Sequence, residues 1–296
     1  MPTLPSTIIA PSFGEQVCNW LSEVHLQFEV KANRAFTTHI EIKNSNGRSL
    51  NILLTDLENW QKAGSFENWQ IEINDLLNQR TKGEQWVVIW EDYWVKKPYI
   101  VKSRLSAMLG ISQKIAARLT QVRRIDQETA FQFLEKNHLN GSVSSKTRYG
   151  LFLPKRYFRV LKKDFEHNIE SDEMLVAVAT FSAPRVFARE DGPFRSFELL
   201  RFASLLGTNV SGGLDKLLTA FVREKEPDDI MTYADREWSE GAGYERLGFE
   251  RISETQPMPF YMSVNEMSRT TTSNPDKIVV YNAGSIKFVK TFKLSD

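Results

Sequence analysis

The sequence predicts an α/β (α+β) protein with two domains. Helix-like and strand-like patterns alternate along the chain, its 296 residues exceed one average domain, and its 41% hydrophobic content can fill two cores. Charged residues make up 25% of the chain, as in ordinary globular proteins, which excludes a fibrous or wholly disordered one. We place the first domain at residues 1–115 and the second at 120–296, with an insertion at about 154–172.

The first domain is expected to combine a leading helix with a sheet. Helix-like spacing of apolar residues runs from 14 to 26, and two strand-like segments lie between 39 and 54. The stretch EQWVVIWEDYW at 84–94 is strongly β-favouring. A helix follows, with Pro98 near its start and Gly110 past its end.

The second domain is expected to hold more strands than helices. Asp126 is placed to cap a helix at 127–138, and strand-like segments follow at intervals up to residue 290. The insertion PKRYFRVLKKDFEHNIESD at 154–172 mixes cations with aromatic residues and separates two strands that would otherwise form a tight hairpin. Its composition suits contacts with bases and phosphates, and it equally suits a flap over a site.

A glycine pair begins one of the predicted helices of this domain. Ser211, Gly212 and Gly213 precede a helix whose apolar residues recur at i, i+3, i+4 and i+7 from Leu214 to Phe221. Glycines allow close approach of the backbone, and the unpaired N–H groups and the dipole of a helix start favour an anion. A plain tight turn explains the same glycines, and both interpretations stay open.

Several polar side chains in this domain are candidates for chemistry. His138 closes a predicted helix, where it suits a proton shuttle or a partner of the helix carbonyls. Asp235 ends a strand and suits a general base or a helix cap, and nearby Tyr233 can donate a phenol proton or stack on a base. Arg201, in mid-strand, needs a partner if it is buried, for which Glu198 and an anion are the alternatives.

Lys and Arg gather in the segment that joins the two domains. The net charge is only +1, yet no acidic residue lies between Lys96 and Arg124. We expect Lys102, Arg123 and Arg124, together with Arg185, to contact a nucleic acid, DNA in the first instance, with a solvated surface as the alternative. No apolar run approaches the roughly 18 residues that span a bilayer, so we expect a cytoplasmic protein without a membrane partner. The sequence does not indicate an oligomeric state.

Several segments, taken in order, resemble a known domain family. They are FLEKNHLNGSVSSKTRYGLF at 133–152, LVAVATFSAPR at 175–185, FELLRFAS at 197–204, TYADREWSEG at 232–241 and GYERLGF at 243–249. They are similar to the GNAT-like acyltransferase domain of phage proteins related to homing endonucleases, and more distantly to the phage Mom family that modifies adenine in DNA. The resemblance covers about residues 120–291 and implies a mixed sheet with flanking helices.

This resemblance implies a cofactor at the glycine pair. In the GNAT fold the equivalent helix start holds the pyrophosphate of an acyl donor, so that acetyl-CoA or another acyl donor would lie against Ser211, Gly212, Gly213 and Tyr244. The loop NVSGGL departs from the family's usual Gln/Arg-x-x-Gly-x-Gly/Ala pattern. A DNA phosphate is therefore the competing occupant.

The first domain resembles the very-short-patch-repair-type nuclease domain, of the PD-(D/E)xK type, that precedes the GNAT-like part in such phage proteins. The similarity is clearest in IWEDYW at 89–94 and IVKSRL at 100–105. Such domains hold a divalent metal with carboxylates, for which Glu15, Glu41 and Asp56 are the candidates in this sequence.

The second strand of this nuclease-like domain lacks the expected key acid. Leu54 and Thr55 stand at its place, and Asp56 is one residue away, on the opposite face of a strand. We therefore expect a degenerate nuclease-like domain that is retained for binding.

These inferences give one main hypothesis and two alternatives. The main hypothesis is a DNA-associated GNAT-like transferase that modifies a nucleobase or another amine and uses its first domain for binding. A metal-dependent endonuclease related to homing enzymes is the first alternative. A non-catalytic nucleic-acid-binding protein is the second.

Overall fold

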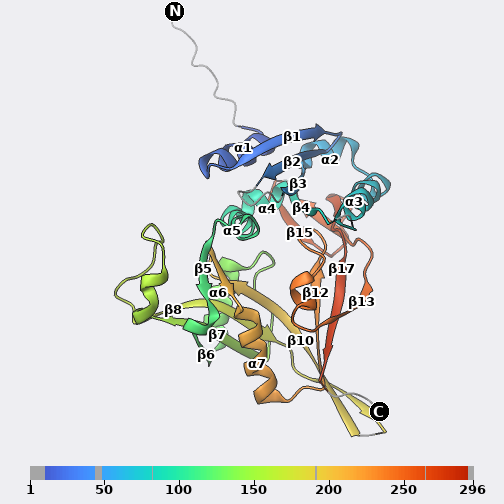
Figure 1. Cartoon of the computed structure of the whole chain (residues 1–296). Coiled ribbons are helices and arrows are strands. Elements are labelled where there is room, and N and C mark those ends of the chain that lie inside the picture. The colour runs from blue at the N-terminus through green and yellow to red at the C-terminus, as the bar shows by residue number, and fades with distance from the viewer. Residues whose placement is uncertain (1–10, 44–48, 82, 191, 264, 293–296) are drawn as a thin grey trace, which may run out of the picture. The chain divides into compact units, whose positions relative to one another are not determined.

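The computed structural model describes residues 11–43, 49–81, 83–190, 192–263 and 265–292, which form two compact units (Figure 1). Unit 1 comprises the chain up to Lys96 together with Met258–Ala283, and unit 2 comprises Lys97–Pro257 with the chain from Gly284 onward. Both units combine sheets with helices. The predicted α/β class with two domains is therefore confirmed.

The division between the units differs from the predicted boundaries of 1–115 and 120–296. Helix α5 (Pro98–Leu109) and strand β5 (Gln113–Ala116) belong to unit 2, where β5 pairs in parallel with β11 (Thr208–Ser211). The segment 258–283, which the sequence assigned to the second domain, belongs to unit 1. Local patterns identify a strand, but the sheet that it joins depends on residues far away in the chain.

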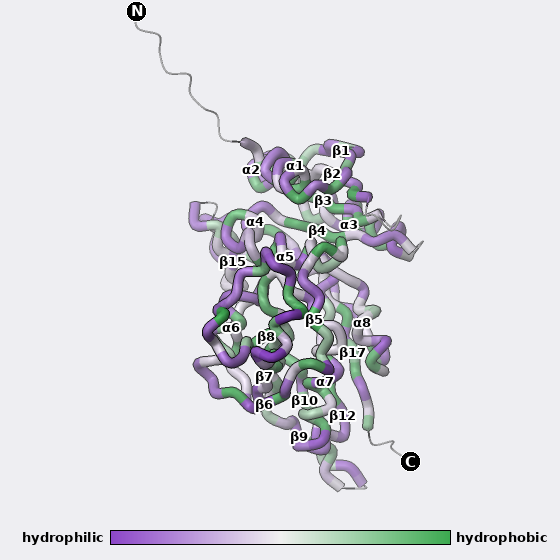
Figure 2. The backbone as a smooth tube through the Cα atoms, turned by 60° about the vertical axis from the view of Figure 1, so that its left-hand side comes forward, coloured by the Kyte–Doolittle hydropathy of each residue, from purple (hydrophilic) through white to green (hydrophobic). Residues whose placement is uncertain are grey.

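Unit 1 is built on a four-stranded sheet with helices on both faces. The strands lie in the order β1 (Gln27–Asn33), β2 (Thr37–Lys43), β3 (Ser49–Thr55) and β4 (Gln85–Trp90), and within this sheet the β3–β4 pair is parallel whereas the other two pairs are antiparallel. The helices are α1 (Phe13–Glu23), α2 (Leu57–Ala63), α3 (Phe66–Thr81) and α4 (Glu91–Lys96). Figure 2 shows apolar and hydrophilic segments alternating along the chain, as expected of elements that bury one face.

Successive residues of the strands face the two helical layers. Thr38 and Leu54 line a hollow beside α1, whereas His39 and Leu53, their neighbours along β2 and β3, line a hollow beneath α3. This alternation is the two-residue period of a strand.

The segment 258–283 completes the core on the α3 side of unit 1. It forms a three-stranded sheet in the order β15 (Ser268–Thr270), β14 (Pro259–Ser263) and β16 (Ile278–Tyr281). Met262 and Val280 are fully buried in a cluster that includes Trp60 and Trp69. The Trp60 indole donates to the Val279 carbonyl at 2.9 Å, and the Trp69 indole donates to the Asn282 carbonyl at 3.0 Å. The buried indoles are thus both packed and hydrogen-bonded by this segment.

One ion pair ties the segment to the rest of unit 1. Arg269, in β15, binds both carboxylate oxygens of Asp92, in α4, with Nε and Nη2 each at 2.7 Å from oxygen. The two side chains are 9% and 4% exposed, and the guanidinium lies 4.5 Å from the centre of the Tyr93 ring. A buried charge that loses its partner is costly, so each member of this pair depends on the other.

Unit 2 has a larger mixed sheet between two helical layers. Its strands lie in the order β13 (Glu250–Glu254), β17 (Ser285–Thr291), β12 (Asp229–Asp235), β10 (Gly192–Ser204), β8 (Glu173–Phe181), β7 (Thr147–Pro154) and β6 (Gln121–Arg124), and β9 (Arg185–Arg189) pairs with the first part of β10. The helices are α6 (Gln127–Asn137), α7 (Gly213–Lys225) and the short α8 (Ala242–Glu245), with 3-10 turns η1 (Ala117–Leu119) and η2 (Lys155–Val160). This mixed sheet with flanking helices is the arrangement that the resemblance implied.

Helices α6 and α7 pack on opposite faces of this sheet. Phe221 of α7 stacks on Phe181 of β8 at 3.9 Å between ring centres, and Leu134 of α6 packs with Val178 of the same strand. Because Val178 and Phe181 are three positions apart, they project from opposite faces of β8. Within the described residues, no helix is both long and apolar enough to cross a bilayer.

We predict that Asp92→Ala destabilises the protein by about 3–5 kcal/mol, because it leaves the Arg269 guanidinium buried without its carboxylate. The double variant Asp92→Ala/Arg269→Met should recover much of this loss. Urea denaturation measures both, with Glu58→Ala as the control, since the Glu58–Lys62 pair is exposed and solvent screening leaves it little effect on stability. Equal losses in the single and double variants would contradict the prediction.

Candidate functional site

In the centre of the unit 2 sheet, two strands pair in parallel over a short distance and then separate. β10 and β12 pair in parallel at Ser196–Glu198 with Asp229–Met231. Beyond that point β10 continues beside β8, whereas β12 continues beside β17. At the divergence the Thr232 hydroxyl donates to the Leu199 carbonyl at 3.0 Å. Two facing strand edges therefore lack mutual backbone pairing at this point.

Tyr244, from α8, reaches the same place. Its hydroxyl interacts with the Thr232 hydroxyl, and burial raises the pKa of Tyr244 above its usual value of 10, although Thr232 and the charge of Arg104 act in the opposite direction. The phenol therefore stays protonated at neutral pH. Arg104, from α5, also lies over the Trp238 ring at 4.1 Å.

The glycine pair stands at the start of α7. Gly212 is the N-cap residue, has φ +76° and offers no side chain to the helix, so the first turn has no side-chain cap. A Cβ on Gly212 would lie 3.7 Å from Ala117, whereas one on Gly213 would lie 3.1 Å from the Val210 side chain. Gly212 is therefore required by its backbone conformation and Gly213 by close packing. Ser211 beside them is exposed.

Lys216, one turn into α7, does not point freely into solvent. Its ammonium donates to the carbonyls of Ala117 and Thr120 at 2.9 and 2.5 Å, and burial lowers its pKa. This cation lies within one turn of Gly212 and adds positive charge to the positive end of the helix. Asp215 adds a negative charge to the same turn, so the features that favour an anion are the missing side-chain cap and the Lys216 ammonium.

A hollow of about 260 Å³ lies between α5, the end of α6 and the last residues of β10. Its polar lining is Ser103, Arg104, Asn137, His138, Ser204, Thr208 and Asn209. The amides of Leu206 and Gly207 beside it are already bonded to the Asn137 and Ser103 side chains at 2.7 and 2.9 Å. A ligand would therefore meet side chains here rather than these two amides.

His138 lines this hollow, and its imidazole is a weak base there. Desolvation and the nearby charges of Arg201, Arg104 and Lys97 lower its pKa to about 3. Its Nδ1 accepts a hydrogen bond from the Asn140 amide at 3.1 Å, which places the ring proton on Nε2. The prediction of a proton shuttle is therefore not supported, and His138 is a neutral hydrogen-bonding group at the end of α6.

Arg201 is a partly buried cation next to His138. Its guanidinium donates to the carbonyls of Gly141 and Leu200 at 3.2 and 2.8 Å. Burial lowers its pKa, and Glu198 opposes this shift only through its charge. Glu198 is therefore not its hydrogen-bonded partner, and an anion stays a suitable ligand.

The structure does not bring the two predicted catalytic residues of β12 into the site. Tyr233 is 43% exposed and alternates with the buried Thr232 and Ala234, so it projects from the face opposite to Tyr244. Asp235 accepts from the Glu237 amide at 2.9 Å and thereby closes the turn after the strand. Strand alternation places the hydroxyl of Thr232, one residue before the predicted Tyr233, on the face of the sheet that Tyr244 reaches.

The residues predicted to contact a nucleic acid differ in how far other side chains already engage them. Arg123 and Arg124 are ion-paired with Glu173 and Glu224, and Lys102 lies in α5 with an interaction of its own. Arg185 begins the exposed strand β9. The carboxylates of Glu173 and Glu224 partly neutralise Arg123 and Arg124, which weakens their attraction for a phosphate.

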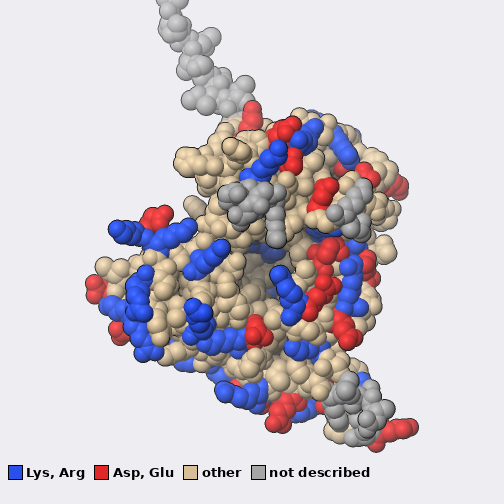
Figure 3. Space-filling view, in the orientation of Figure 1, with Lys and Arg blue, Asp and Glu red and all other residues tan. Residues whose placement is uncertain are grey.

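Six further exposed cations of unit 2 lie on β5, η1, η2 and the residues that follow η2. We call this group the basic face; it comprises Lys114, Arg118, Lys155, Arg156, Arg159 and Lys163. The Gln113 side chain joins these segments, because it donates to the Val160 carbonyl at 3.2 Å and accepts from the Lys162 amide at 2.7 Å. Figure 3 shows Lys and Arg gathered at the lower left, over the part of unit 2 that contains β6, β7 and β8 in Figure 1.

The three predicted metal ligands in unit 1 do not meet. Glu15 and Asp56 line one hollow, which Thr38 and Leu54 also line, whereas Glu41 lines another with Lys31 and Ser49. Glu15 closes the capping box of α1 with Ser12, and Asp56 caps α2. In the part of the chain that the structure describes, no three acidic, His or Cys side chains are grouped to hold a metal.

The comparisons with known proteins give distant structural likenesses. No family model matches the chain, and a comparison with curated proteins found no match. Similar solved structures include a Bacillus subtilis acetyltransferase with CoA (10% identity, TM-score 0.34) and a GNAT family acetyltransferase of Elizabethkingia anophelis with acetyl-CoA (11%, 0.34), each covering 59% of this chain and 99% of its own. Arabidopsis thaliana NAA60 with acetyl-CoA (10%, 0.37) covers 58% and 99%. At such TM-scores these likenesses identify no activity for this chain.

We predict that His138 makes the protein less stable in acid. Its folded-state pKa of about 3 lies below the unfolded value near 6.5, so that below pH 6.5 the unfolded chain binds a proton that the folded chain does not. Stability from this group is therefore complete above pH 6.5 and falls by about 1.4 kcal/mol per pH unit until about pH 3.

His138→Asn keeps a hydrogen-bond acceptor for the Asn140 amide but cannot take up a proton. Thermal unfolding between pH 7 and 4.5 should show a steeper loss in the wild type than in this variant. Parallel pH profiles would show that His138 titrates normally.

Proposed function

We propose that unit 2 is a GNAT-like transferase that moves an acyl-type group to a nucleobase or another amine. The divergence of β10 and β12 supports this proposal most directly, because Thr232 and Tyr244 meet where the two strands separate in the centre of the sheet. The uncapped start of α7 directly follows β11, which succeeds β10 in the chain. Together these features provide an anion position and a phenol in one α/β unit.

The start of α7 fits the anionic part of an acyl donor such as acetyl-CoA. The helix lacks a side-chain cap, Gly212 leaves the approach open, and Lys216 contributes a cation. Ser211, Gly212 and Gly213 would hold the pyrophosphate with backbone N–H groups and one hydroxyl. When bound, such a donor supplies an activated acyl group and a thiolate leaving group.

Tyr244, where β10 and β12 separate, and His138, in the hollow beside α5, define the proton chemistry that these parts of unit 2 offer. Tyr244 keeps its proton at neutral pH and is the proton donor of the site. His138 stays neutral and can orient a polar group through Nε2–H, but with a pKa of about 3 it is too weak a base to accept an amine proton. We therefore infer that the acceptor amine reaches the site in its neutral form, as the exocyclic amine of a nucleobase does. Tyr244 would give its proton to the leaving thiolate and take up the N–H proton that the amine loses on acylation.

The basic face supports a nucleic acid as the source of that amine. Its six cations are exposed, and Arg156 and Arg159 flank the Tyr157 ring at 5.1 and 5.6 Å. Phosphate contacts of this kind supply affinity without sequence preference. Unit 1 then serves as a binding domain in which the carboxylates of Glu15 and Asp56 stabilise helix starts.

We predict that Ser211→Asp weakens acetyl-CoA binding about 10-fold, because it puts a negative charge beside the proposed pyrophosphate position. The same charge favours the helix itself, so stability should not fall. Calorimetry with acetyl-CoA measures the change. Thr219→Asp, an exposed position further along α7, is the matched control and should change affinity less than 2-fold. Absence of binding by the wild type at millimolar acetyl-CoA would rule out this donor.

We also predict that Arg118→Glu/Arg156→Glu reduces the salt dependence of DNA binding. Each lost phosphate contact lowers the slope of log K against log salt by about 0.9, so the double variant should lose roughly 2. Fluorescence anisotropy with a labelled duplex at 50–200 mM salt provides the slopes. Lys136→Glu/Lys146→Glu, exposed positions outside the basic face, changes the net charge equally. Equal slopes for the two double variants would show that the basic face does not bind the phosphates.

A further inference from the structure

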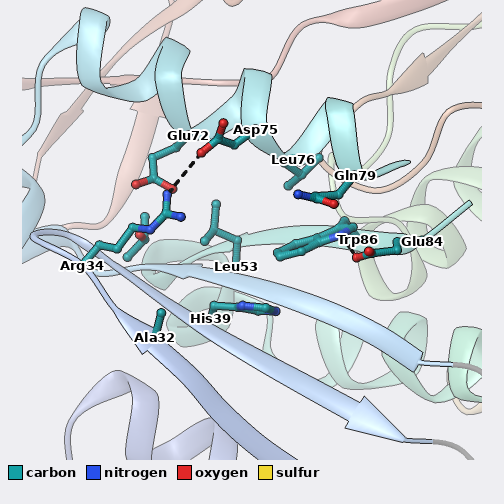
Figure 4. A pocket seen from close by; sticks show the side chains of 11 residues that line it. Ala32, Arg34, His39, Leu53, Glu72, Asp75, Leu76, Gln79, Glu84 and Trp86 are labelled. Carbon is teal, nitrogen blue, oxygen red and sulfur yellow. Dashed lines mark hydrogen bonds and ion pairs between the residues drawn. The ribbon is translucent and has the colours of Figure 1, made fainter. Parts of the chain in front are cut away.

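Unit 1 contains a hollow of about 310 Å³ beneath α3, on the sheet face opposite to Glu15 and Asp56. Figure 4 shows the open space between the Arg34 guanidinium on one side and the His39 and Trp86 rings on the other, with Leu53 as its apolar floor. Glu72, Asp75 and Gln79 of α3 extend toward it from above. A volume of this size is sufficient for a small organic ligand.

One polar group in this lining lacks a partner. Thr37 is 3% exposed, and its hydroxyl is the only polar side-chain atom of the lining that is buried without a hydrogen bond among the described residues. An unpaired buried hydroxyl is unfavourable, so Thr37 is the group of this lining to which a hydrogen bond from a bound ligand would add most.

The ring pair forms a fixed platform on the opposite wall. The His39 and Trp86 ring centres are 4.4 Å apart and the planes are inclined by 31°. His39 Nε2 contacts Asn51 Oδ1 at 2.9 Å, and the Trp86 indole donates to Glu84 at 3.0 Å. Both rings are therefore oriented by hydrogen bonds before any ligand binds, which favours a flat ligand.

The charges of the lining favour a ligand rich in N–H donors. Glu72, Asp75 and Glu84 are carboxylates, and Arg34 is the single Lys or Arg among the described residues that line the hollow. Arg34 binds Glu72 at 2.7 Å and lies 3.7 Å from Asp75. Acceptors therefore outnumber cations, which opposes a phosphate inside the hollow.

We propose that this hollow binds an amino-bearing nucleobase. The heterocycle would pack against the His39–Trp86 pair and Leu53, and its amino and ring N–H groups would donate to the carboxylates and to the Thr37 hydroxyl. A compact ammonium is less suitable, because Arg34 would repel it and because an ammonium has no flat face for the ring pair. The site lies wholly in unit 1 and goes beyond the transferase proposed for unit 2.

Calorimetry of the full chain with adenosine, guanosine, cytidine and uridine tests this proposal. At least one of the three amino-bearing nucleosides should bind at least 10-fold more tightly than uridine, which has no exocyclic amine. A short single-stranded oligonucleotide of the preferred base, compared with its free nucleoside, distinguishes an unpaired base in a strand from a free ligand. Because no acyl donor is present, the outcome is independent of transferase activity.

Two variants separate recognition from folding. Thr37→Val preserves shape and removes the unpaired hydroxyl, so it should weaken nucleoside binding on the order of 3- to 10-fold while the thermal stability of the free protein stays the same or rises. Asp75→Asn should also weaken binding, whereas Glu58→Gln, exposed on α2, should not. The proposal is overturned if no nucleoside binds at millimolar concentration, if uridine binds as tightly, if spermidine binds in preference, or if Thr37→Val leaves affinity unchanged.

Discussion

The short parallel pairing of β10 with β12 is the constraint on which the site of unit 2 depends. Parallel neighbours cannot be joined by a tight turn, so the chain must cross the sheet through a helix, which is α7 here. The crossover fixes where α7 begins, and Gly212 supplies the left-handed backbone that this start requires. Since the pairing covers only three residues on each strand, the strand ends separate and the Thr232 hydroxyl turns to the Leu199 carbonyl. The separation of the strand ends and the position of the α7 start are thus two results of the same topology.

Three positively charged side chains near the end of α6 determine the protonation state of His138. Arg201, Arg104 and Lys97 come from β10, α5 and the residue before α5, and all three act on His138. The imidazole responds by staying neutral, because a further positive charge in this desolvated place would be unfavourable. The result is a surface that holds positive charge without a titrating base. Such a surface suits an anionic or strongly polar ligand better than it suits acid–base catalysis by histidine.

The sequence predicts those features that depend on neighbouring residues. Pro98 and Gly110 bound α5 as expected, with Gly110 in the left-handed conformation, and Asp126 caps α6 through the Thr129 amide. In the aromatic stretch 84–94, the strand β4 ends at Trp90 and the helix α4 begins at Glu91. The acidic Glu91 and Asp92 favour a helix start at this point.

Site residues were harder to predict, because alternation along a strand and pairing across the sheet decide which side chains meet. Thr232 rather than Tyr233 faces Tyr244, although the two are adjacent in sequence. Glu41 and Asp56 line different hollows, although the strands β2 and β3 are paired. A shift of one residue reverses the face of a side chain, and local sequence patterns do not contain that information.

The core of unit 1 depends on the segment 258–283, which follows most of unit 2 in the chain. It lies in the chain between β13 and β17, which pair with each other in unit 2, yet its own strands supply Met262 and Val280 to the tryptophan core of unit 1. The core of unit 1 therefore combines residues more than 200 positions apart, as in the hydrogen bond from Trp60 to Val279. Closing so long a loop has an entropic cost, which the burial of two apolar side chains, two indole hydrogen bonds and the Arg269–Asp92 pair offsets. A chain that ended before residue 258 would leave that core without these partners, so the stability of unit 1 is a property of the nearly complete chain.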